Sequence, residues 1–257
     1  MLIDAHCHLH FSSLDSPLGV SQNSLSSLCH RSVVNGTCEA DWPEVVALSH
    51  QHPELVHPSF GLHPWKVRER SARWEQALRK LLLDLPHSAV GECGLDRWKR
   101  PYDLNDQIQV FRTHLKLASE LDRPITIHCL QAWGALLETL RTCDSLPRRL
   151  LLHSFCGSIE VARELSSLGA HFSLSGYFLH SRKASQLAVF RQLPPEQIHF
   201  ESDAPEMSPP SQFQRWGKAG LNHPADFPLI ASALSAASGV SLQQATDNTQ
   251  NFFRISL

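Results

Sequence analysis

The stretch LIDAHCHL, residues Leu2–Leu9, decides the fold because it joins a short apolar run to two closely spaced histidines. Such a run predicts a β-strand. His6 and His8 stand two residues apart, so their side chains point to the same face of that strand. Two imidazoles on one strand form half of a metal site, although two half-buried polar residues at a strand end would give the same pattern. The other strands must distinguish these interpretations.

Seven further apolar, β-branched runs recur at wide and fairly even intervals: Ser32–Cys38, Val56–His63, Ala89–Leu95, Pro124–Cys129, Arg149–Phe155, Ala170–Ser175 and Ile198–Ser202. Segments with helical spacing of apolar residues lie between several of them: Trp74–Leu85, Gln107–Leu121, Ala132–Leu140 and Ile159–Leu168. Strands that alternate with helices indicate parallel βαβ units. Eight units in a chain of 257 residues fit a closed barrel better than an open doubly wound sheet, and no GxGxxG or Walker pattern follows a strand. We therefore predict an α/β fold, a (β/α)8 TIM barrel with residues 1–257 in a single domain.

Composition narrows the functional classes. Hydrophobic residues make up 42% and charged residues 19%, the balance of a folded protein. No segment offers the roughly 18 uncharged apolar residues of a membrane span, and the start of the chain leaves no room for a signal peptide. We expect a cytoplasmic protein with no membrane partner and no obligate protein partner. The net charge of -2 gives no global basic field, so any contact with nucleic acid should be local. Seven cysteines without CxxC spacing disfavour a disulfide framework or a cysteine zinc site.

Four further predicted strands carry an ionisable residue at or near their end: Glu92, His128, His153 and Asp203. In a barrel the strand ends converge on one face, so residues far apart in the sequence become neighbours. Burying so many ionisable groups is costly, and a divalent cation is the simplest partner that accepts both imidazole and carboxylate. The alternative, in which each group is separately hydrogen-bonded to the backbone, requires several independent coincidences.

The ordered set of motifs resembles the TatD-type metal-dependent deoxyribonucleases of the amidohydrolase superfamily. The matching segments are IDAHCHL (3–9), GLHP (61–64), GECGLD (91–96), IH (127–128), HSFCGS (153–158), ESDAP (201–205) and NHP (222–224). The resemblance implies two divalent ions, which the mixed ligands would allow to be zinc, manganese or magnesium. It places His6, His8 and Asp203 around one ion. It places His128 and His153 around the other, with Glu92 bridging both.

The resemblance also implies a reaction, in which water activated by the metals attacks a phosphodiester phosphorus. Asp203 and Glu92 are then the catalytic residues, and Asp203 both binds metal and accepts the proton of the water. The expected substrate is DNA or another phosphodiester. Cleavage by an exonuclease, or at a short single-stranded region, suits a surface that would grip duplex poorly.

One departure from the family pattern keeps other functions open. Leu130 and Gln131 stand where many members have an arginine followed by an acidic residue, and Leu130 cannot hold a phosphate. This change favours a metal-dependent amidohydrolase or esterase that acts on a small molecule, since barrels of this kind host many chemistries. A third possibility is a non-catalytic barrel scaffold, against which the intact Glu92 and Asp203 argue.

Residues around the expected mouth carry weaker predictions. His63 could bind a phosphate oxygen or could order the turn at Pro64. Asp96 could orient a metal-binding histidine. The cations Arg97, Lys99 and Arg100 could form an anion pocket or could simply be solvated. Aromatic residues on the loop face could stack on bases, although loop packing is favoured for any one of them: Trp65, Trp98, Phe155, Tyr177 and Trp216. Cys7, Cys93 and Cys129 are expected as small core residues, and Ala204–His223 as a long surface loop.

Overall fold

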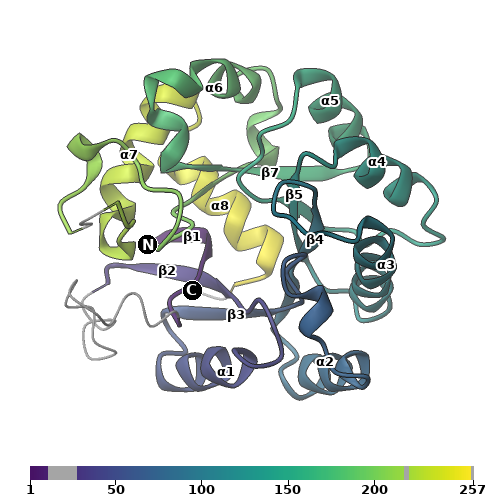
Figure 1. Ribbon diagram of the computed structural model, residues 1–257. Helices are drawn as coiled ribbons and strands as arrows, with labels where there is room; N and C mark the ends of the chain where they lie inside the picture. Colours follow the sequence, from purple (N-terminus) through teal and green to yellow (C-terminus); the bar gives the residue numbers. More distant parts are fainter. Residues whose placement is uncertain (11–27, 217–219, 256–257) are drawn as a thin grey trace.

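Eight parallel strands form the centre of the computed structural model, which describes residues 1–10, 28–216 and 220–255. The strands lie side by side in chain order (Figure 1): β1 Leu2–Cys7, β2 His30–Asn35, β3 Val56–Phe60, β4 Ala89–Asp96, β5 Ile125–Leu130, β6 Leu150–Leu152, β7 Ala170–Ser175 and β8 Ile198–Glu201. Two backbone hydrogen bonds link β1 to the residues that follow β8. Asp203 N donates to His6 O at 2.9 Å, and His8 N donates to Ala204 O at 2.8 Å. The predicted TIM barrel is confirmed.

Seven helices surround the strands and cover the outside of the ring (Figure 1): α1 Trp42–Gln51, α2 Trp74–Asp84, α3 Leu104–Glu120, α4 Trp133–Arg141, α5 Ile159–Ser167, α6 Ala184–Phe190 and α7 Phe227–Ser238. The last helix, α8 Leu242–Phe253, lies across the middle of the ring in this view. Polar residues begin several of the helices. The side chains of Asp103, Ser158 and Ser241 each accept a hydrogen bond from a backbone N–H in the first turn. Along α3 the buried Phe111, Leu115 and Ala118 recur at helical spacing and face the strands.

Several strands end earlier than the sequence predicts, whereas β4 and β5 each end one residue later, at Asp96 and Leu130. β1 ends at Cys7 instead of Leu9, β3 at Phe60 instead of His63, and β6 at Leu152 instead of Phe155. The apolar run continues past the last ladder hydrogen bond in each case, because the following residues are buried at the mouth of the barrel without belonging to the sheet. His8, His63 and His153 therefore belong to the beginnings of the loops that follow these strands.

Two strands contain an extra residue next to the mouth. Between Asp4 and Cys7, β1 advances three residues while its partner β2 advances two. Between Val90 and Cys93, β4 likewise advances three residues while its partner β5 advances two. Such bulges re-aim side chains and occur often beside functional sites. Gly94 permits the close approach of β4 to β5, since a Cβ there would lie 2.0 Å from the carbonyl oxygen of His128.

The interior of the barrel is apolar at the opposite end. Ile3 and Ala5 of β1 pack in one buried cluster with Phe252, Phe253 and Ile255 from the end of α8 and the residues after it. Histidines contact the same aromatic residues, since His57 packs against Phe253, and His171 and His199 pack against Phe252.

The structure also tests the predictions for the cysteines, the loop Ala204–His223 and membrane spans. Cys7, Cys93 and Cys129 are buried in the core, as predicted, and all seven cysteines are free. The expected surface loop Ala204–His223 is partly wrong, because Ala204, Pro205 and Asn222 are buried. Residues 217–219 of that segment lie outside the described residues. In the described part of the chain no single helix is long and apolar enough to cross a membrane; only the bent pair Pro224–Ser238 and Leu242–Phe253 meets the length and composition criteria together.

Candidate metal centre

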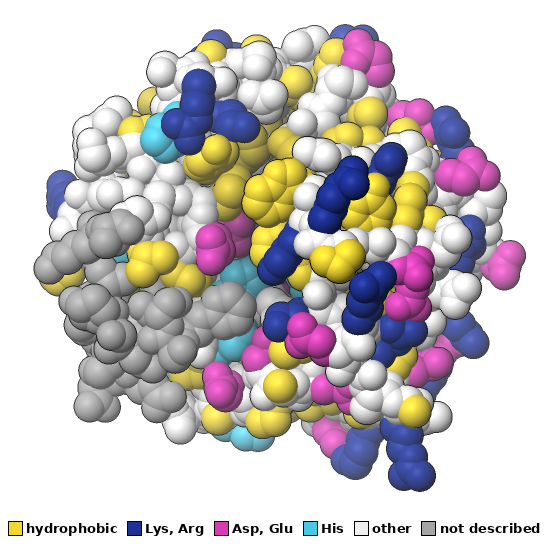
Figure 2. All heavy atoms as spheres, viewed as in Figure 1, with side chains coloured by type: hydrophobic (Ala, Val, Ile, Leu, Met, Phe, Trp, Pro, Cys, Tyr) yellow, Lys and Arg dark blue, Asp and Glu magenta, His cyan; other side chains and the backbone are white. Residues whose placement is uncertain are grey.

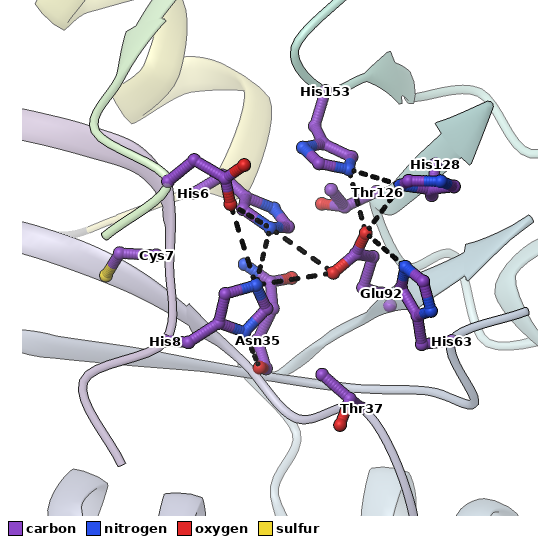
Figure 3. A network of polar contacts seen from close by, with 12 residues as sticks. His6, Cys7, His8, Asn35, Thr37, His63, Glu92, Thr126, His128 and His153 are labelled. Atoms are coloured by element: carbon purple, nitrogen blue, oxygen red, sulfur yellow. Dashed lines mark hydrogen bonds and ion pairs between the residues drawn. The ribbon is translucent and has the colours of Figure 1, made fainter. Parts of the chain in front are cut away.

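The carboxylate of Glu92 lies at the middle of the barrel mouth, where five histidines surround it (Figure 3). Its Oε2 atom lies 3.5 Å from His6 Nε2 and 3.4 Å from His8 Nε2. Asp203 Oδ1 completes this side, at 3.5 Å from His6 Nε2 and 3.6 Å from His8 Nε2. His6, His8 and Asp203 thus present three donor atoms close enough to share one ion.

The other oxygen of Glu92 faces a second group of histidines. Oε1 lies 2.8 Å from His153 Nε2, 3.1 Å from His128 Nδ1 and 3.3 Å from His63 Nε2. His63, Glu92 and His128 form another set of donor atoms close enough to share an ion. The structure therefore brings together all six residues that the sequence singles out as ligands, and it adds His63 to the second group.

Neighbouring oxygen atoms orient the rings of two histidines. His8 Nδ1 lies 2.8 Å from the carbonyl oxygen of Asn35, and His128 Nε2 lies 2.9 Å from Asp96 Oδ2. Because these oxygens accept hydrogen bonds, the outer nitrogen of the neutral ring carries the proton and the inner nitrogen presents a lone pair toward Glu92. Lone pairs and carboxylate oxygens that converge in a buried cluster need a cation between them, so the residues fit a divalent metal.

Burial and charge shift the pKa values of the cluster in different directions. Burial raises the pKa of Asp203 to about 7 and lowers that of His6 to about 4. Burial also opposes ionisation of Glu92, but His153 and the other surrounding histidines outweigh it and hold the Glu92 pKa well below its usual value. Glu92 therefore carries a negative charge at neutral pH and attracts cations.

Two buried carboxylates beneath the cluster were not assigned a role from the sequence. Glu201 Oε1 lies 3.7 Å from His153 Nδ1 and accepts hydrogen bonds from the backbone N–H and the hydroxyl of Ser154. Asp4 accepts from the backbone N–H groups of His6 and Ser202. Each stands two residues before a proposed ligand, Asp4 before His6 within β1 and Glu201 before Asp203 at the end of β8, and this spacing is the signal that the sequence offers for them.

A cavity of about 910 Å³ opens above the cluster. Figure 2 shows the hollow, with acidic and histidine side chains visible inside it and basic and hydrophobic side chains around its rim. Leu130, Gln131 and His63 line it, as do Trp65, Trp98 and Tyr177 among the predicted aromatic residues. Its volume lies near the upper end of the roughly 300–1,000 Å³ of small-molecule sites.

Other predicted contact residues lie elsewhere. Phe155 is buried and packs against Trp133 and Phe172, so it belongs to the core. Trp216 does not line the described cavity and stacks instead on His223 at 6.1 Å between ring centroids. Among the basic residues after β4, Arg97 contacts Tyr102, whereas Lys99 and Arg100 line a smaller neighbouring pocket of about 200 Å³.

The closed barrel and the buried cluster of histidine and carboxylate donors at its mouth define a metal-dependent hydrolase. Comparison with known proteins gives the family: the model of TatD-related DNases matches residues 3–255, and the chain belongs to this family. The 3'-5' ssDNA/RNA exonuclease TatD of Erwinia tasmaniensis is 26% identical over 208 residues, which cover 80% of each chain. The metal-dependent hydrolase YjjV of Escherichia coli K12 is 29% identical over 208 residues, again 80% of each chain.

The crystal structure of YjjV also matches the whole barrel. Its TM-score is 0.87 at 25% sequence identity, and the match covers 99% of this chain and 98% of YjjV. These relatives support a hydrolase that uses divalent metal, and they favour neither the small-molecule amidohydrolase or esterase nor the non-catalytic scaffold.

Proposed function

We propose that the protein is a two-metal phosphodiesterase that cleaves DNA from a strand end. The observation that carries this proposal is the placement of the Glu92 carboxylate. Its two oxygens face two separate groups of nitrogen and oxygen donors. A carboxylate in that position is suited to bridge two ions. Two-metal sites are typical of enzymes that displace groups at phosphorus, where the ions stand roughly 3.5–4 Å apart.

The residues divide between the two positions by their distances. His6, His8 and Asp203 would hold one ion, and His128 and His153 the other. The mixture of imidazole and carboxylate suits zinc or manganese, while loosely held magnesium also supports phosphoryl chemistry. When bound, the ions would stabilise charge on the attacking and leaving oxygens and would lower the pKa of a water.

Asp203 and His63 would act on the reactants directly. Asp203 lines the cavity, and its carboxylate would accept the proton of a water held beside the ions. His63 Nδ1 accepts a hydrogen bond from the backbone N–H of Trp65 at 3.1 Å. Its Nε2 therefore carries the proton in the neutral ring, and this N–H points toward the cluster. It would donate to a phosphate oxygen, while Nδ1 orders the turn.

Nucleic acid is the substrate that the relatives support, because the Erwinia tasmaniensis protein is named as an exonuclease of single-stranded DNA and RNA. The small net charge of -2 agrees with a protein that contacts nucleic acid over only a small part of its surface. The single domain, the cytoplasmic location and the lack of an obligate protein partner stay predictions from the sequence.

A comparison of substrates tests the proposal. Metal-free protein reconstituted with manganese, zinc or magnesium is assayed on bis(p-nitrophenyl) phosphate, p-nitrophenyl acetate and a p-nitroanilide. We expect metal-dependent hydrolysis of the phosphodiester at a rate well above those for the ester and the amide. Faster hydrolysis of the carboxylic ester or the amide would overturn the proposal in favour of small-molecule hydrolysis.

A further inference from the structure

Two cations at the cavity lack the ion pairs that several other basic side chains form. Arg70, Arg79 and Lys80, for example, each contact a carboxylate. Among the described residues, neither Arg182 nor Lys183 forms an ion pair, and both line the cavity. Lys66 lines it too, but Lys66 is paired with Glu69 at 3.1 Å.

Arg182 and Lys183 cluster around one aromatic ring. The Arg182 guanidinium carbon and the Lys183 Nζ each lie 5.1 Å from the centroid of Tyr177, and Arg182 Nη2 donates to the Tyr177 hydroxyl at 3.1 Å. These contacts hold two positive charges at the rim without neutralising them. We call Tyr177, Arg182 and Lys183 the basic wall.

A second wall consists of two indoles. Trp65 and Trp98 line the cavity with 40% and 57% of their surfaces exposed, and their ring centroids lie 6.1 Å apart. Lys99 Nζ lies 4.2 Å from the centroid of Trp65. Large aromatic rings that stay exposed beside a polar cluster are suited to stack on bases. We call Trp65 and Trp98 the aromatic wall.

The two walls belong to opposite sides of the barrel. The aromatic wall follows β3 and β4, whereas the basic wall follows β7, which is four strands from β3 in a ring of eight (Figure 1). Glu92 lines the same cavity as all five wall residues, at the mouth of the ring on whose opposite sides the two walls stand. A ligand that touches both walls therefore crosses the cluster.

We propose that the aromatic wall stacks on unpaired bases and the basic wall binds the phosphates of the same strand, so that a single strand, and not a duplex, is drawn across the cluster. The inference rests on the proposed function and adds the residues that select the substrate. Bases inside a duplex already stack on one another and leave no face for Trp65 or Trp98.

The salt dependence of binding tests the basic wall. Anisotropy of a labelled single-stranded oligonucleotide in a chelator gives the association constant without cleavage. Each lost phosphate contact lowers the slope of log K against log [salt] by about 0.7 for a single strand. Arg182→Ala with Lys183→Ala should therefore lower the slope by about 1.4. Lys80→Ala with Lys116→Ala, on the outer helices, is the charge-matched control and should leave the slope unchanged. An unchanged slope in the basic-wall variant overturns the inference, as does equal loss in the control or no binding by the wild type.

Abasic substrates test the aromatic wall. Trp65→Ala with Trp98→Ala should weaken binding of an ordinary oligonucleotide by roughly tenfold or more, because each stacked base contributes about 1–3 kcal/mol. Binding of an oligonucleotide made of abasic nucleotides should change less than twofold. The Trp→Phe double variant keeps two rings and should retain most of the affinity, and Trp216→Ala is the matched control. Equal losses on ordinary and abasic strands would refute base stacking.

Hydrolysis of bis(p-nitrophenyl) phosphate separates this inference from the proposed function. That substrate is too small to need both walls, so its hydrolysis by the wild type reports on the cluster around Glu92 alone. If the wild type hydrolyses it while the wall variants bind oligonucleotides as tightly as wild type, the inference fails and the proposed function stands. If the wild type does not hydrolyse it with any metal, the proposed function itself fails.

Discussion

Glu92 Oε1 lies 2.8 Å from His153 Nε2, while the second oxygen of the same carboxylate faces His6 and His8. Glu92 is 2% exposed, so solvent screens these contacts weakly. The proposed bridging role follows from this arrangement, because removal of one negative charge weakens the attraction for an ion on either side.

Glu92→Gln should therefore weaken binding of both ions instead of one. We expect isothermal titration with manganese or zinc to show two sites in the wild type, and both dissociation constants to rise at least tenfold in the variant. Circular dichroism checks that the barrel is intact. Two undisturbed sites in Glu92→Gln would refute the bridging role.

Asp96 should act on metal affinity through His128. Its Oδ2 lies 2.9 Å from His128 Nε2, and Oδ1 accepts from the backbone N–H groups of Trp98 and Lys99. Carboxylates that orient a ligating histidine typically contribute about 10- to 100-fold in metal affinity. Asp96→Asn should weaken one ion by that factor and leave the other unchanged. The exposed Asp84→Asn is the control, and an unaltered titration of Asp96→Asn would contradict the role.

Chelation should destabilise the fold if the cluster binds metal in its native state. At a free concentration of about 100 times Kd, each ion adds about 2.7 kcal/mol to the free energy of unfolding. For a chain of this size that corresponds to a rise in Tm of roughly 5–10 °C per ion. Differential scanning calorimetry with and without EDTA measures the shift. A variant that carries both His8→Asn and His153→Asn should show almost none, and an equal shift in that variant would place the metal elsewhere.

His114 gives a pH dependence that does not involve the metals. It is buried in α3, accepts from the backbone N–H of Leu62 at 3.1 Å and donates to Val110 O at 2.8 Å. Burial lowers its pKa to about 4. Between pH 6.5 and 4 the unfolded chain binds the proton and the folded chain does not, so stability falls as the pH drops through this window.

Urea unfolding in EDTA at pH 7 and pH 5 measures this effect. The contribution of His114 to the loss of stability at pH 5 is about 2 kcal/mol, calculated from the two pKa values. His114→Gln should show a correspondingly smaller drop between the two pH values. The same drop in variant and wild type would mean that His114 is not the neutral buried residue that the contacts describe.

The sequence predicts the barrel and the location of the site well, for a simple physical reason. Ionisable residues at the ends of apolar strands are rare, and a parallel barrel brings those ends to one face. Glu92 and Asp203 could therefore be placed together although 111 positions separate them. The strand ends were harder to place, because His8 and His63 are buried at the mouth whether or not they belong to a ladder.

Most residues that act through other residues could not be identified from the sequence alone. Asp4 and Glu201 lie on strands and are fully buried, yet only the structure shows that their carboxylates face the backbone and His153 at the cluster. Arg182 and Lys183 lie in a short helical turn, Ser181–Lys183, where two cations usually remain solvated. Their importance depends on the closeness of Tyr177 and on a shared cavity, and neither is visible in the order of residues.

Cleavage of single-stranded and duplex oligonucleotides with added magnesium, manganese or zinc, by wild type and by Asp203→Asn, shows directly whether the protein is a metal-dependent nuclease. We expect metal-dependent shortening of the single strand from one end by the wild type. Because Asp203 would both bind metal and accept a proton, the variant should lose about 10²–10⁴-fold in rate or more with an unchanged fold. No cleavage of either substrate by folded, metal-loaded wild type, or an unchanged kcat in Asp203→Asn, would contradict the account.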